Sequence, residues 1–250
     1  MGRTWDARSY DRVGGPMTAM ALAVVDRLEL RGDEVVLDAG CGTGRVTEHL
    51  LERLPTGRVI AVDADPDMVA TAREVLGSRA VVRRADLTEL VLDEPVDAVL
   101  STATFHWVLD HERLFQRLFA VLRPAGRLVA QCGGAGNLSQ LLGATEAVAS
   151  SDGWERYFAG WSRPMRYAGP DETADLLRAA GFTDVRCWLQ PHPITPDEPL
   201  EYLATVPLGA HLDRLPDERK RPFVEEVAAR LPEPVTADYV RLNIDARRPA

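Results

Sequence analysis

The chain has 250 residues, of which 46% are hydrophobic and 27% charged, the composition of a globular protein able to bury a full core. Its formal net charge of −9 at pH 7 argues against a duplex nucleic-acid binder, because such proteins neutralise phosphates with Lys and Arg. Three separated cysteines without zinc-ligand spacing predict neither a disulfide framework nor a metal site.

From about residue 32 to residue 133, short β-branched runs alternate with amphipathic segments, the pattern of βαβ units and a parallel sheet. Pro66 after Asp65 indicates a helix start, and Arg123-Pro124 indicates a helix end. We expect strands at residues 34–40, 57–65, 79–86, 96–104 and 126–134, with helices at 45–54, 66–76 and 111–122.

After residue 134 the regular alternation is lost, and four aromatic residues gather in a segment that we interpret as a cap: Trp154, Tyr157, Phe158 and Trp161. The remaining chain predicts a helix at 170–182 with Gly181 as its stop, a strand at 183–190, a Pro-rich connection, a helix at 216–231 interrupted by Pro222, and a last strand at 236–248.

These segments suggest how the chain is organised. Its length favours one domain of generous size with an inserted cap. We expect an N-terminal lid segment (1–30), a core that carries the binding motif (31–134), a cap insertion (135–170) and the rest of the core (171–250), with a second cap segment near 191–235.

The strongest local signal is "VLDAGCGTG", residues 36–44, where Gly40, Gly42 and Gly44 alternate after an apolar run that contains Asp38. In open parallel sheets a ligand lies beyond the carboxyl ends of the strands, and the first strand-to-helix turn is its commonest contact. Glycine lacks a Cβ, so a ligand can lie against the backbone. The helix that follows presents unpaired N–H groups, which favour an anionic group.

A second signal is Asp63, which lies near the end of the second expected strand, 19 residues after Gly44. A carboxylate at this place can accept both hydroxyls of a ribose, which fits either NAD or S-adenosylmethionine. The dinucleotide fingerprint is G-x-G-x-x-G, whereas this chain has G-x-G-x-G, so the spacing favours S-adenosylmethionine. A nicotinamide-dependent oxidoreductase stays open as an alternative.

Several motifs, in order, resemble those of the class I S-adenosylmethionine-dependent methyltransferases. They are "VLDAGCGTG" (36–44), "VDADPDM" (62–68), "RADL" (84–87), "STATFHWVLDH" (101–111) and "LRPAGRLVA" (122–130). "WDARSYDR" and "FHWVLDHERLFQRL" are similar to the trans-aconitate methyltransferase-like branch, in the type 11 group. The resemblance spans roughly residues 30–190. It implies an α/β Rossmann-like, doubly wound, mostly parallel seven-stranded sheet with an antiparallel last strand and a helical cap over the strand ends.

The resemblance also implies S-adenosylmethionine as cofactor and S-adenosylhomocysteine as product. The implied cofactor-binding residues are Asp38, Gly40, Cys41, Gly42, Gly44, Asp63, Ala64, Met68, Asp86, Leu87 and Thr102, with Trp5 and Tyr10 as a lid. Structural explanations stay open beside these roles: the three acids can be turn or capping residues, Cys41 a small packed residue, and the two lid aromatics a cover over core surface.

His106 and Trp107, in the loop after the fourth expected strand, are the candidate catalytic residues. A carboxylate acceptor is ionised at neutral pH and needs no base. A hydroxyl, amine or carbon acid would need one, and His106 is then the candidate, although a structural role is equally open. We expect O-methylation of a small molecule, with a carboxylate as one possible acceptor; C- or N-methylation with His106 as base, and a non-catalytic cofactor-binding homologue, are the alternatives.

The cap gives weaker indications about partners. Its aromatic residues suggest an apolar or mixed substrate, and Arg163 and Arg166 could clamp an acid, although exposed arginines are commoner. The N-terminus is polar and no apolar stretch is long enough to span a bilayer. We therefore expect a cytoplasmic monomer or homodimer that binds a small molecule, without a nucleic-acid, membrane or metal partner.

Overall fold

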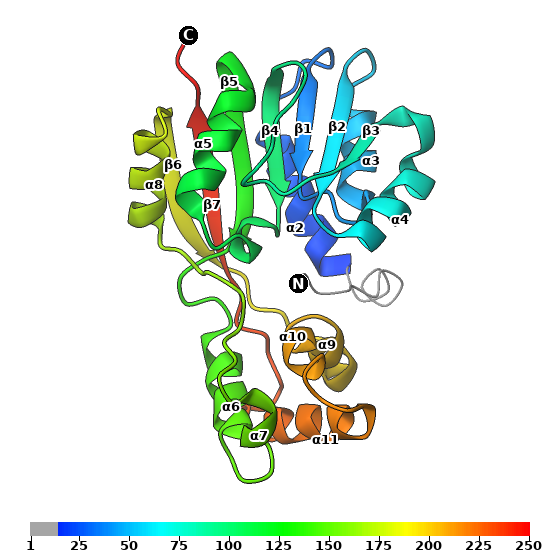
Figure 1. The fold of residues 1–250 in the computed structure, drawn as a ribbon, viewed down its shortest axis with the longest axis vertical. Coiled ribbons are helices and arrows are strands. Elements are labelled where there is room, and N and C mark those ends of the chain that lie inside the picture. The colour runs from blue at the N-terminus through cyan, green and yellow to red at the C-terminus, as the bar shows by residue number, and fades with distance from the viewer. Residues whose placement is uncertain (1–14) are drawn as a thin grey trace. The chain divides into compact units, whose positions relative to one another are not determined.

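The computed structural model describes residues 15–250, so Trp5 and Tyr10 lie outside the described residues. Each of the seven strands expected from the sequence is present (Figure 1). The strands are β1 (Val35–Ala39), β2 (Arg58–Asp63), β3 (Val81–Arg84), β4 (Val96–Thr102), β5 (Leu122–Gly133), β6 (Thr183–Pro191) and β7 (Val240–Arg247).

The strands form one sheet in the order β3-β2-β1-β4-β5-β7-β6. β1 pairs in parallel with β2 and β4, β5 pairs in parallel with β4, and β7 runs antiparallel to β5. This confirms the expected mostly parallel, Rossmann-like sheet with an antiparallel last strand. The strand order reverses between β1 and β4, so their carboxyl ends flank the point where open sheets of this kind bind ligands.

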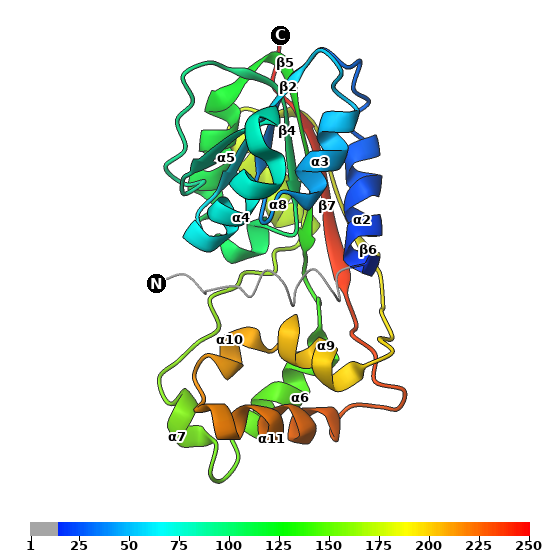
Figure 2. The same ribbon diagram turned by 90° about the vertical axis from the view of Figure 1, so that its right-hand side faces the viewer.

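Helices cover both faces of this sheet (Figure 2), because alternate residues of its central strands are buried on opposite sides. Val36 packs with Leu50 of α3 on one face, and Leu37 packs with Phe115 of α5 on the other. The helices of this part are α2 (Gly15–Asp26), α3 (Arg45–Glu52), α4 (Pro66–Leu76), α5 (His111–Val121) and α8 (Pro170–Ala179), with the 3-10 helices η1 (Gly77–Arg79) and η2 (Phe105–Trp107).

The described residues divide into two compact units. Unit 1 carries the sheet and comprises the described chain up to Ala135, Met165–Gln190 and Arg241–Ala250, while unit 2 comprises Gly136–Pro164 and Pro191–Val240. Unit 2 is helical, with α6 (Ser139–Ala149), α7 (Glu155–Phe158), α9 (Pro199–Thr205), α10 (Gly209–Leu212) and α11 (Asp217–Ala228).

The two stretches of unit 2 share one aromatic core. The Trp154 ring lies 5.1 Å from the Phe223 ring, and the Phe158 ring lies 5.3 Å from it. His211 is 5% exposed and its ring lies 4.9 Å from that of Trp161. Residues from 154–161 and from 211–223 are therefore buried against each other, and neither stretch could form this core alone.

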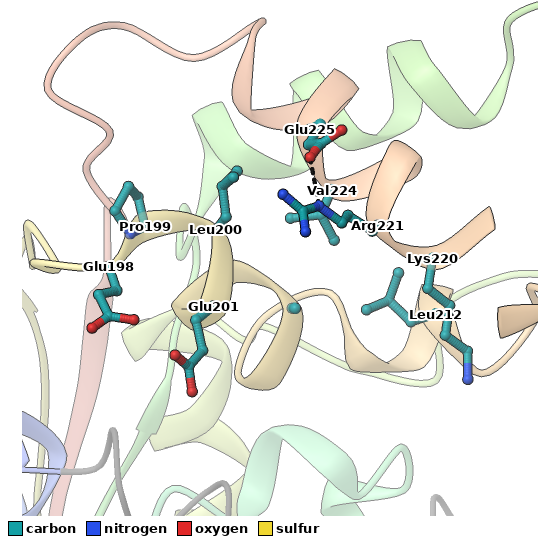
Figure 3. A pocket seen from close by; sticks show the side chains of 10 residues that line it. Glu198, Pro199, Leu200, Glu201, Leu212, Lys220, Arg221, Val224 and Glu225 are labelled. Carbon is teal, nitrogen blue, oxygen red and sulfur yellow. Dashed lines mark hydrogen bonds and ion pairs between the residues drawn. The ribbon is translucent and has the colours of Figure 1, made fainter. Parts of the chain in front are cut away.

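A groove of about 750 Å³ lies in unit 2 between α9 and α11 (Figure 3). Leu200, Leu212 and Val224 line it with apolar surface. Charged side chains also border it, including Arg221, whose Nε donates to Glu225 at 2.8 Å. None of the described residues that the sequence predicts for the functional site lines this groove.

Five of the described helices have no individual counterpart among those expected from the sequence: α2, α6, α7, α9 and α10. The apolar residues of α2 have no clear helical spacing, and α7, α9 and α10, with 4, 7 and 4 residues, are too short to show a periodic pattern. The sequence places α6 and α7 only within the cap segment, without separate bounds. The interruption expected at Pro222 is wrong, because α11 continues through it; the fixed φ of proline is close to the helical value, although proline has no N–H and the helix lacks one hydrogen bond there. None of the described helices is long and apolar enough to cross a membrane.

Candidate functional site

The loop between β1 and α3, residues 40–44, is called the glycine loop here. The N–H groups of Gly40 and Cys41 donate to the carbonyl of Val62 in β2 at 2.8 and 3.0 Å. Gly40, Gly42 and Gly44 have φ values of 87°, 54° and 87°, in the left-handed region that side chains disfavour. The backbone path of the loop therefore explains why glycine alternates in the motif.

The three glycines differ in what surrounds them. A Cβ on Gly40 would lie 2.1 Å from Oγ1 of Thr104, and a Cβ on Gly44 would lie 3.0 Å from the Leu76 side chain. A Cβ on Gly42 would meet no atom of the described residues within 4 Å. Gly40 and Gly44 thus permit close packing inside the protein, whereas Gly42 leaves the backbone open to a ligand.

Asp38 lies near the end of β1 and is only 1% exposed. Its Oδ2 accepts a hydrogen bond from Thr47 Oγ1 at 2.6 Å, while its Oδ1 is buried and has no hydrogen-bond partner among the described residues. Burial raises the pKa of Asp38 to about 6; the Thr47 hydrogen bond opposes the rise and the charge of Asp63 adds to it. An acceptor in this state is satisfied by a cation or by an N–H donor.

Asp63 ends β2 beside the glycine loop. Its Oδ2 accepts from the Gly42 N–H and its Oδ1 from the Asp65 N–H, both at 2.9 Å. Burial raises the pKa of Asp63, and these two hydrogen bonds oppose the rise. The carboxylate is thereby oriented, and because each of its oxygens can accept more than one hydrogen bond, it can also receive hydroxyl groups.

The helix after β2 begins as the sequence predicts. Asp65 caps α4 by accepting from the N–H groups of Asp67 and Met68 at 2.9 and 3.0 Å. Met68 is 7% exposed, whereas Ala64 is exposed and its carbonyl accepts from Arg84 Nε at 3.1 Å.

The segment after β3 carries Asp86 and Leu87. The Asp86 Oδ1 accepts from both the N–H and the Oγ1–H of Thr88, at 2.8 and 2.7 Å. This is the local capping arrangement that the sequence leaves open for this acid. The Leu87 side chain is 5% exposed and belongs to the core beside Leu90.

The end of β4 is joined to the glycine loop through Thr104. Its Oγ1 can donate to the carbonyl of Gly40 at 3.2 Å or to that of Thr102 at 3.0 Å. The η2 turn, Phe105–Trp107, follows directly. The structure therefore brings the loop after β4 against the loop after β1, as expected at this point of the sheet.

His106 in the η2 turn is 8% exposed, and its Nδ1 accepts a hydrogen bond from the Gly133 N–H at 3.2 Å. Its ring lies 5.4 Å from that of Trp107 and 5.8 Å from that of Tyr167. A backbone N–H can only donate, so Nδ1 holds a lone pair and the proton of the neutral ring lies on Nε2. This assignment follows from the hydrogen-bond network.

Residues outside the turn also bind its carbonyl groups. The Phe105 carbonyl accepts from His111 Nε2 at 3.0 Å, and the His106 carbonyl accepts from the Arg166 N–H at 2.9 Å. The Arg166 guanidinium donates to the Leu109 carbonyl at 3.0 Å and pairs with Glu172. Arg166 is thus engaged by the loop after β4, which differs from the substrate clamp considered from the sequence.

Four residues of this arrangement were missed in the sequence, namely Thr47, Thr104, His111 and Gly133, and Arg166 was considered there only as a possible clamp for an acid. Only Thr47 carried a usable signal, since it lies in the first turn of the helix that follows the glycine motif. The others meet through the fold, and no local pattern marks them.

The aromatic residues that suggest an apolar or mixed substrate in the sequence have a structural role in unit 2. Trp154 and Phe158 are 2% and 9% exposed, and both belong to the core of unit 2. Their burial accounts for the aromatic cluster in the sequence. Among residues 15–250, no group of three or more His, Cys, Asp or Glu side chains is placed to hold a metal ion.

Comparisons with known proteins show what this chain is similar to. A family model described as a methyltransferase domain matches residues 37–130. A trans-aconitate 2-methyltransferase of Variovorax paradoxus is 30% identical over 254 residues, covering 95% of this chain and 93% of that protein. An uncharacterized methyltransferase of Schizosaccharomyces pombe is 31% identical, covering 71% of this chain and 70% of that protein.

A solved structure adds a likeness in fold. Phosphoethanolamine N-methyltransferase 2 of Haemonchus contortus, in complex with phosphomonomethylethanolamine and S-adenosylhomocysteine, matches with a TM-score of 0.66 and 18% identity. The match covers 98% of this chain, which spans 57% of the length of that one.

Proposed function

Because the chain belongs to the class I S-adenosylmethionine-dependent methyltransferases, we propose that it methylates a carboxylate oxygen of a small organic acid. Relatives named trans-aconitate 2-methyltransferase support an acid as acceptor, since the substrate in that name is a carboxylate. The family assignment replaces the oxidoreductase alternative. The choice of a carboxylate as acceptor rests on the hydrogen bond from the Gly133 N–H to His106 Nδ1.

The residues around the glycine loop fit the cofactor of this family. The buried Asp38 Oδ1 lacks a partner among the described residues, and a cationic ammonium group, directly or through water, would supply one. Asp63 would accept the ribose hydroxyls, and the N-terminus of α3 would favour the carboxylate. When bound, S-adenosylmethionine supplies a methyl group on a sulfonium cation.

The tautomer of His106 argues for an acceptor that is already ionised. The lone pair on Nδ1 is used by the Gly133 N–H, and Nε2 carries the proton, so the ring in this state donates a hydrogen bond and accepts no proton. A carboxylate is ionised at neutral pH and needs no base. His106 would then hold the acceptor oxygen in place rather than deprotonate it.

Positioning is the main catalytic device in this proposal. An in-line methyl transfer needs the acceptor oxygen fixed close to the reacting carbon, and holding that geometry removes much of the entropic part of the barrier. His106 and Trp107, on a turn anchored to β5, would fix the acceptor, while the aromatic surface of Trp107 and Tyr167 would exclude water.

The test compares two substitutions of His106. His106→Gln keeps an N–H donor at the place of Nε2 but cannot act as a base, whereas His106→Phe removes the donor. Both variants and the wild type are assayed over pH 6.5–9 with trans-aconitate and other di- and tricarboxylic acids, and with phenols and amines as comparison acceptors. Products are identified by mass spectrometry and by mild alkali, which cleaves a methyl ester but not an N- or C-methyl bond.

We expect an alkali-labile product from at least one acid. His106→Gln should keep turnover within about tenfold of the wild type, and His106→Phe should lose roughly 10- to 100-fold, the effect of one hydrogen bond to a charged group. Loss of 10²- to 10⁴-fold in both variants, with a rate that rises through the histidine pKa range, would instead favour C- or N-methylation with His106 as base.

A further inference from the structure

The loop that follows β4 is held by hydrogen bonds to its carbonyl groups that come from outside the turn. His111 donates to the Phe105 carbonyl, and Arg166 donates to the His106 carbonyl through its backbone and to the Leu109 carbonyl through its guanidinium. All three distances lie between 2.9 and 3.0 Å. The backbone on both sides of His106 is therefore fixed by two residues.

The hydrogen bond from His111 is not required to close the 3-10 turn. The Phe105 carbonyl already accepts the Val108 N–H at 3.0 Å, which closes the 3-10 turn, and His111 Nε2 is a second donor at 3.0 Å. A carbonyl can only accept, so the His111 proton lies on Nε2 and its Nδ1 holds a lone pair. That Nδ1 is buried and has no hydrogen-bond partner among the described residues.

The surroundings of His111 favour an apolar ring on grounds of stability alone. The side chain is 1% exposed, and its ring lies 5.7 Å from that of Phe115. Burial lowers the pKa of His111, the Phe105 carbonyl opposes this, and the charge of Arg166 adds to the lowering. Burying a neutral imidazole with one unpartnered nitrogen lowers the stability of the folded protein. The contact that opposes this cost is the hydrogen bond to the Phe105 carbonyl.

Arg166 reaches the same loop from a segment far along the chain. Its guanidinium is shared between the Leu109 carbonyl and Glu172 in the first turn of α8, which holds the arginine in place. The next residue, Tyr167, lies with its ring 5.8 Å from the ring of His106. The segment 166–167 thus binds the backbone of His106 on one side and contacts its ring on the other.

We propose that His111 and Arg166 are positioning residues for methyl transfer, which fix the η2 turn so that the His106 Nε2–H meets the acceptor. This proposal rests on the proposed function for its catalytic consequence. Neither residue touches the acceptor itself, and both act through the backbone of Phe105, His106 and Leu109. Their loss should therefore lower kcat while leaving cofactor binding and the fold intact.

The decisive variant is His111→Phe, which keeps the ring and removes the donor. We expect kcat to fall on the order of 10- to 100-fold, the effect of a small misplacement of an acceptor-binding group. We expect the dissociation constant of S-adenosylhomocysteine, measured by calorimetry, to stay unchanged, and Tm to stay unchanged or rise. His111→Gln, which replaces the Nε2 donor by an amide N–H, should recover most of the activity.

Phe115→Leu is the packing control, because the Phe115 ring lies 5.7 Å from the His111 ring and 6.0 Å from the Phe105 ring, so the substitution disturbs packing on both residues while the His111 donor stays present. It should lower Tm with little effect on kcat. Glu172→Gln tests the second residue: it weakens the support of the Arg166 guanidinium and should lower kcat less than His111→Phe does. Equal losses of kcat in His111→Phe and Phe115→Leu would overturn the proposal.

A second measurement does not depend on turnover. In protein labelled with ¹⁵N-histidine, the ring nitrogens of His106, assigned from their absence in His106→Gln, should show a proton fixed on Nε2 in the wild type. In His111→Phe the two nitrogens should become partly averaged, as the bond from Gly133 N–H loosens. Unchanged His106 signals would overturn the positioning role, whereas absence of methylation with every acid would overturn only the proposed function.

Discussion

The two halves of the site are built in different ways. The half at the ends of β1 and β2 consists of a glycine loop and two carboxylates: backbone N–H groups of the loop donate to Val62 and Asp63, and Asp38 accepts from Thr47. The half at the ends of β4 and β5 consists of a short turn whose carbonyl groups and imidazole are bound by His111, Gly133 and Arg166.

This difference predicts different responses to substitution. In the first half the backbone conformation of the glycine loop determines the shape of the site, so one added Cβ is enough to disturb that shape. In the second half the shape depends on side chains contributed by separate elements, so damage should be graded and should affect turnover more than binding. The following predictions test this contrast, beginning with the largest expected effect.

Gly40→Ala should be the most damaging change. Its Cβ would lie 2.1 Å from Oγ1 and 2.2 Å from Cγ2 of Thr104, at a φ of 87°. We expect a loss of about 3 kcal/mol in the free energy of unfolding, measured by urea titration, with loss of cofactor binding. Gly42→Ala meets no described atom within 4 Å and should cost about 1 kcal/mol, from its backbone conformation alone.

A second substitution checks the cause of that loss. Thr104→Gly removes every Thr104 atom that the new Cβ would meet, so the double variant Gly40→Ala/Thr104→Gly should regain part of the stability. Equal stability of Gly40→Ala and Gly42→Ala would contradict the idea that the two halves touch at this point.

Asp38→Asn should separate stability from binding. The folded-state pKa of Asp38 is raised from 3.8 to about 6, so its ionised form destabilises the free protein above pH 6, and this penalty fades as the pH falls toward 4. At pH 7.5 the variant should be more stable by about 2 kcal/mol, measured by thermal unfolding without cofactor, yet bind S-adenosylmethionine at least about tenfold more weakly. The affinity of the wild type for S-adenosylmethionine should also fall below pH 6, because protonation of Asp38 removes its negative charge. A less stable variant with unchanged affinity would contradict this.

His211→Phe gives a reference in unit 2, which contains neither half of the site. Burial lowers the pKa of His211 to about 4, with the Arg163 charge adding to the effect. The unfolded chain therefore binds a proton that the folded chain resists, and stability is lost as the pH falls from about 6.5 to 4, opposite in sign to the effect of Asp38. At pH 5 the variant should recover up to about 2 kcal/mol relative to the wild type in urea unfolding. If the free energy of unfolding of the wild type and of His211→Phe changed in parallel between pH 7 and pH 4, the prediction would be wrong.

Asp86→Ala should have the smallest effect. It removes the acceptor that holds the Thr88 turn, at an exposed site, and should cost less than about 1 kcal/mol. If Asp86 also contacts the adenine, affinity for S-adenosylmethionine in calorimetry should fall by less than about tenfold. Asp86→Asn keeps the oxygen for Thr88 and should restore stability; an affinity unchanged in both variants would leave Asp86 as a turn residue only.

The contrast between the halves also explains what could be predicted from the sequence. Short sequence motifs identify the three glycines and the Asp65 cap: Gly40, Gly42 and Gly44 alternate, and Asp65 precedes Pro66. The strand pattern predicts that these motifs lie at the carboxyl ends of the strands. His111 and Arg166 have no such local mark, because their partners lie on a turn that only the fold brings to them. In the sequence Trp154 and Phe158 suggest an apolar or mixed substrate, because a cluster of aromatic residues has the same local pattern in a core and in a pocket.

Unit 2 is made from two stretches inserted at different points of the chain, after β5 and after β6. Apart from their end residues Pro191 and Val240, these stretches contribute no strand to the seven-stranded sheet. They depend on each other, because Trp154 and Phe158 from the first are buried against Phe223 from the second. A chimaera that exchanges one stretch with a relative should therefore misfold in unit 2, whereas exchanging both together should give a well-folded hybrid that keeps the parent's sheet.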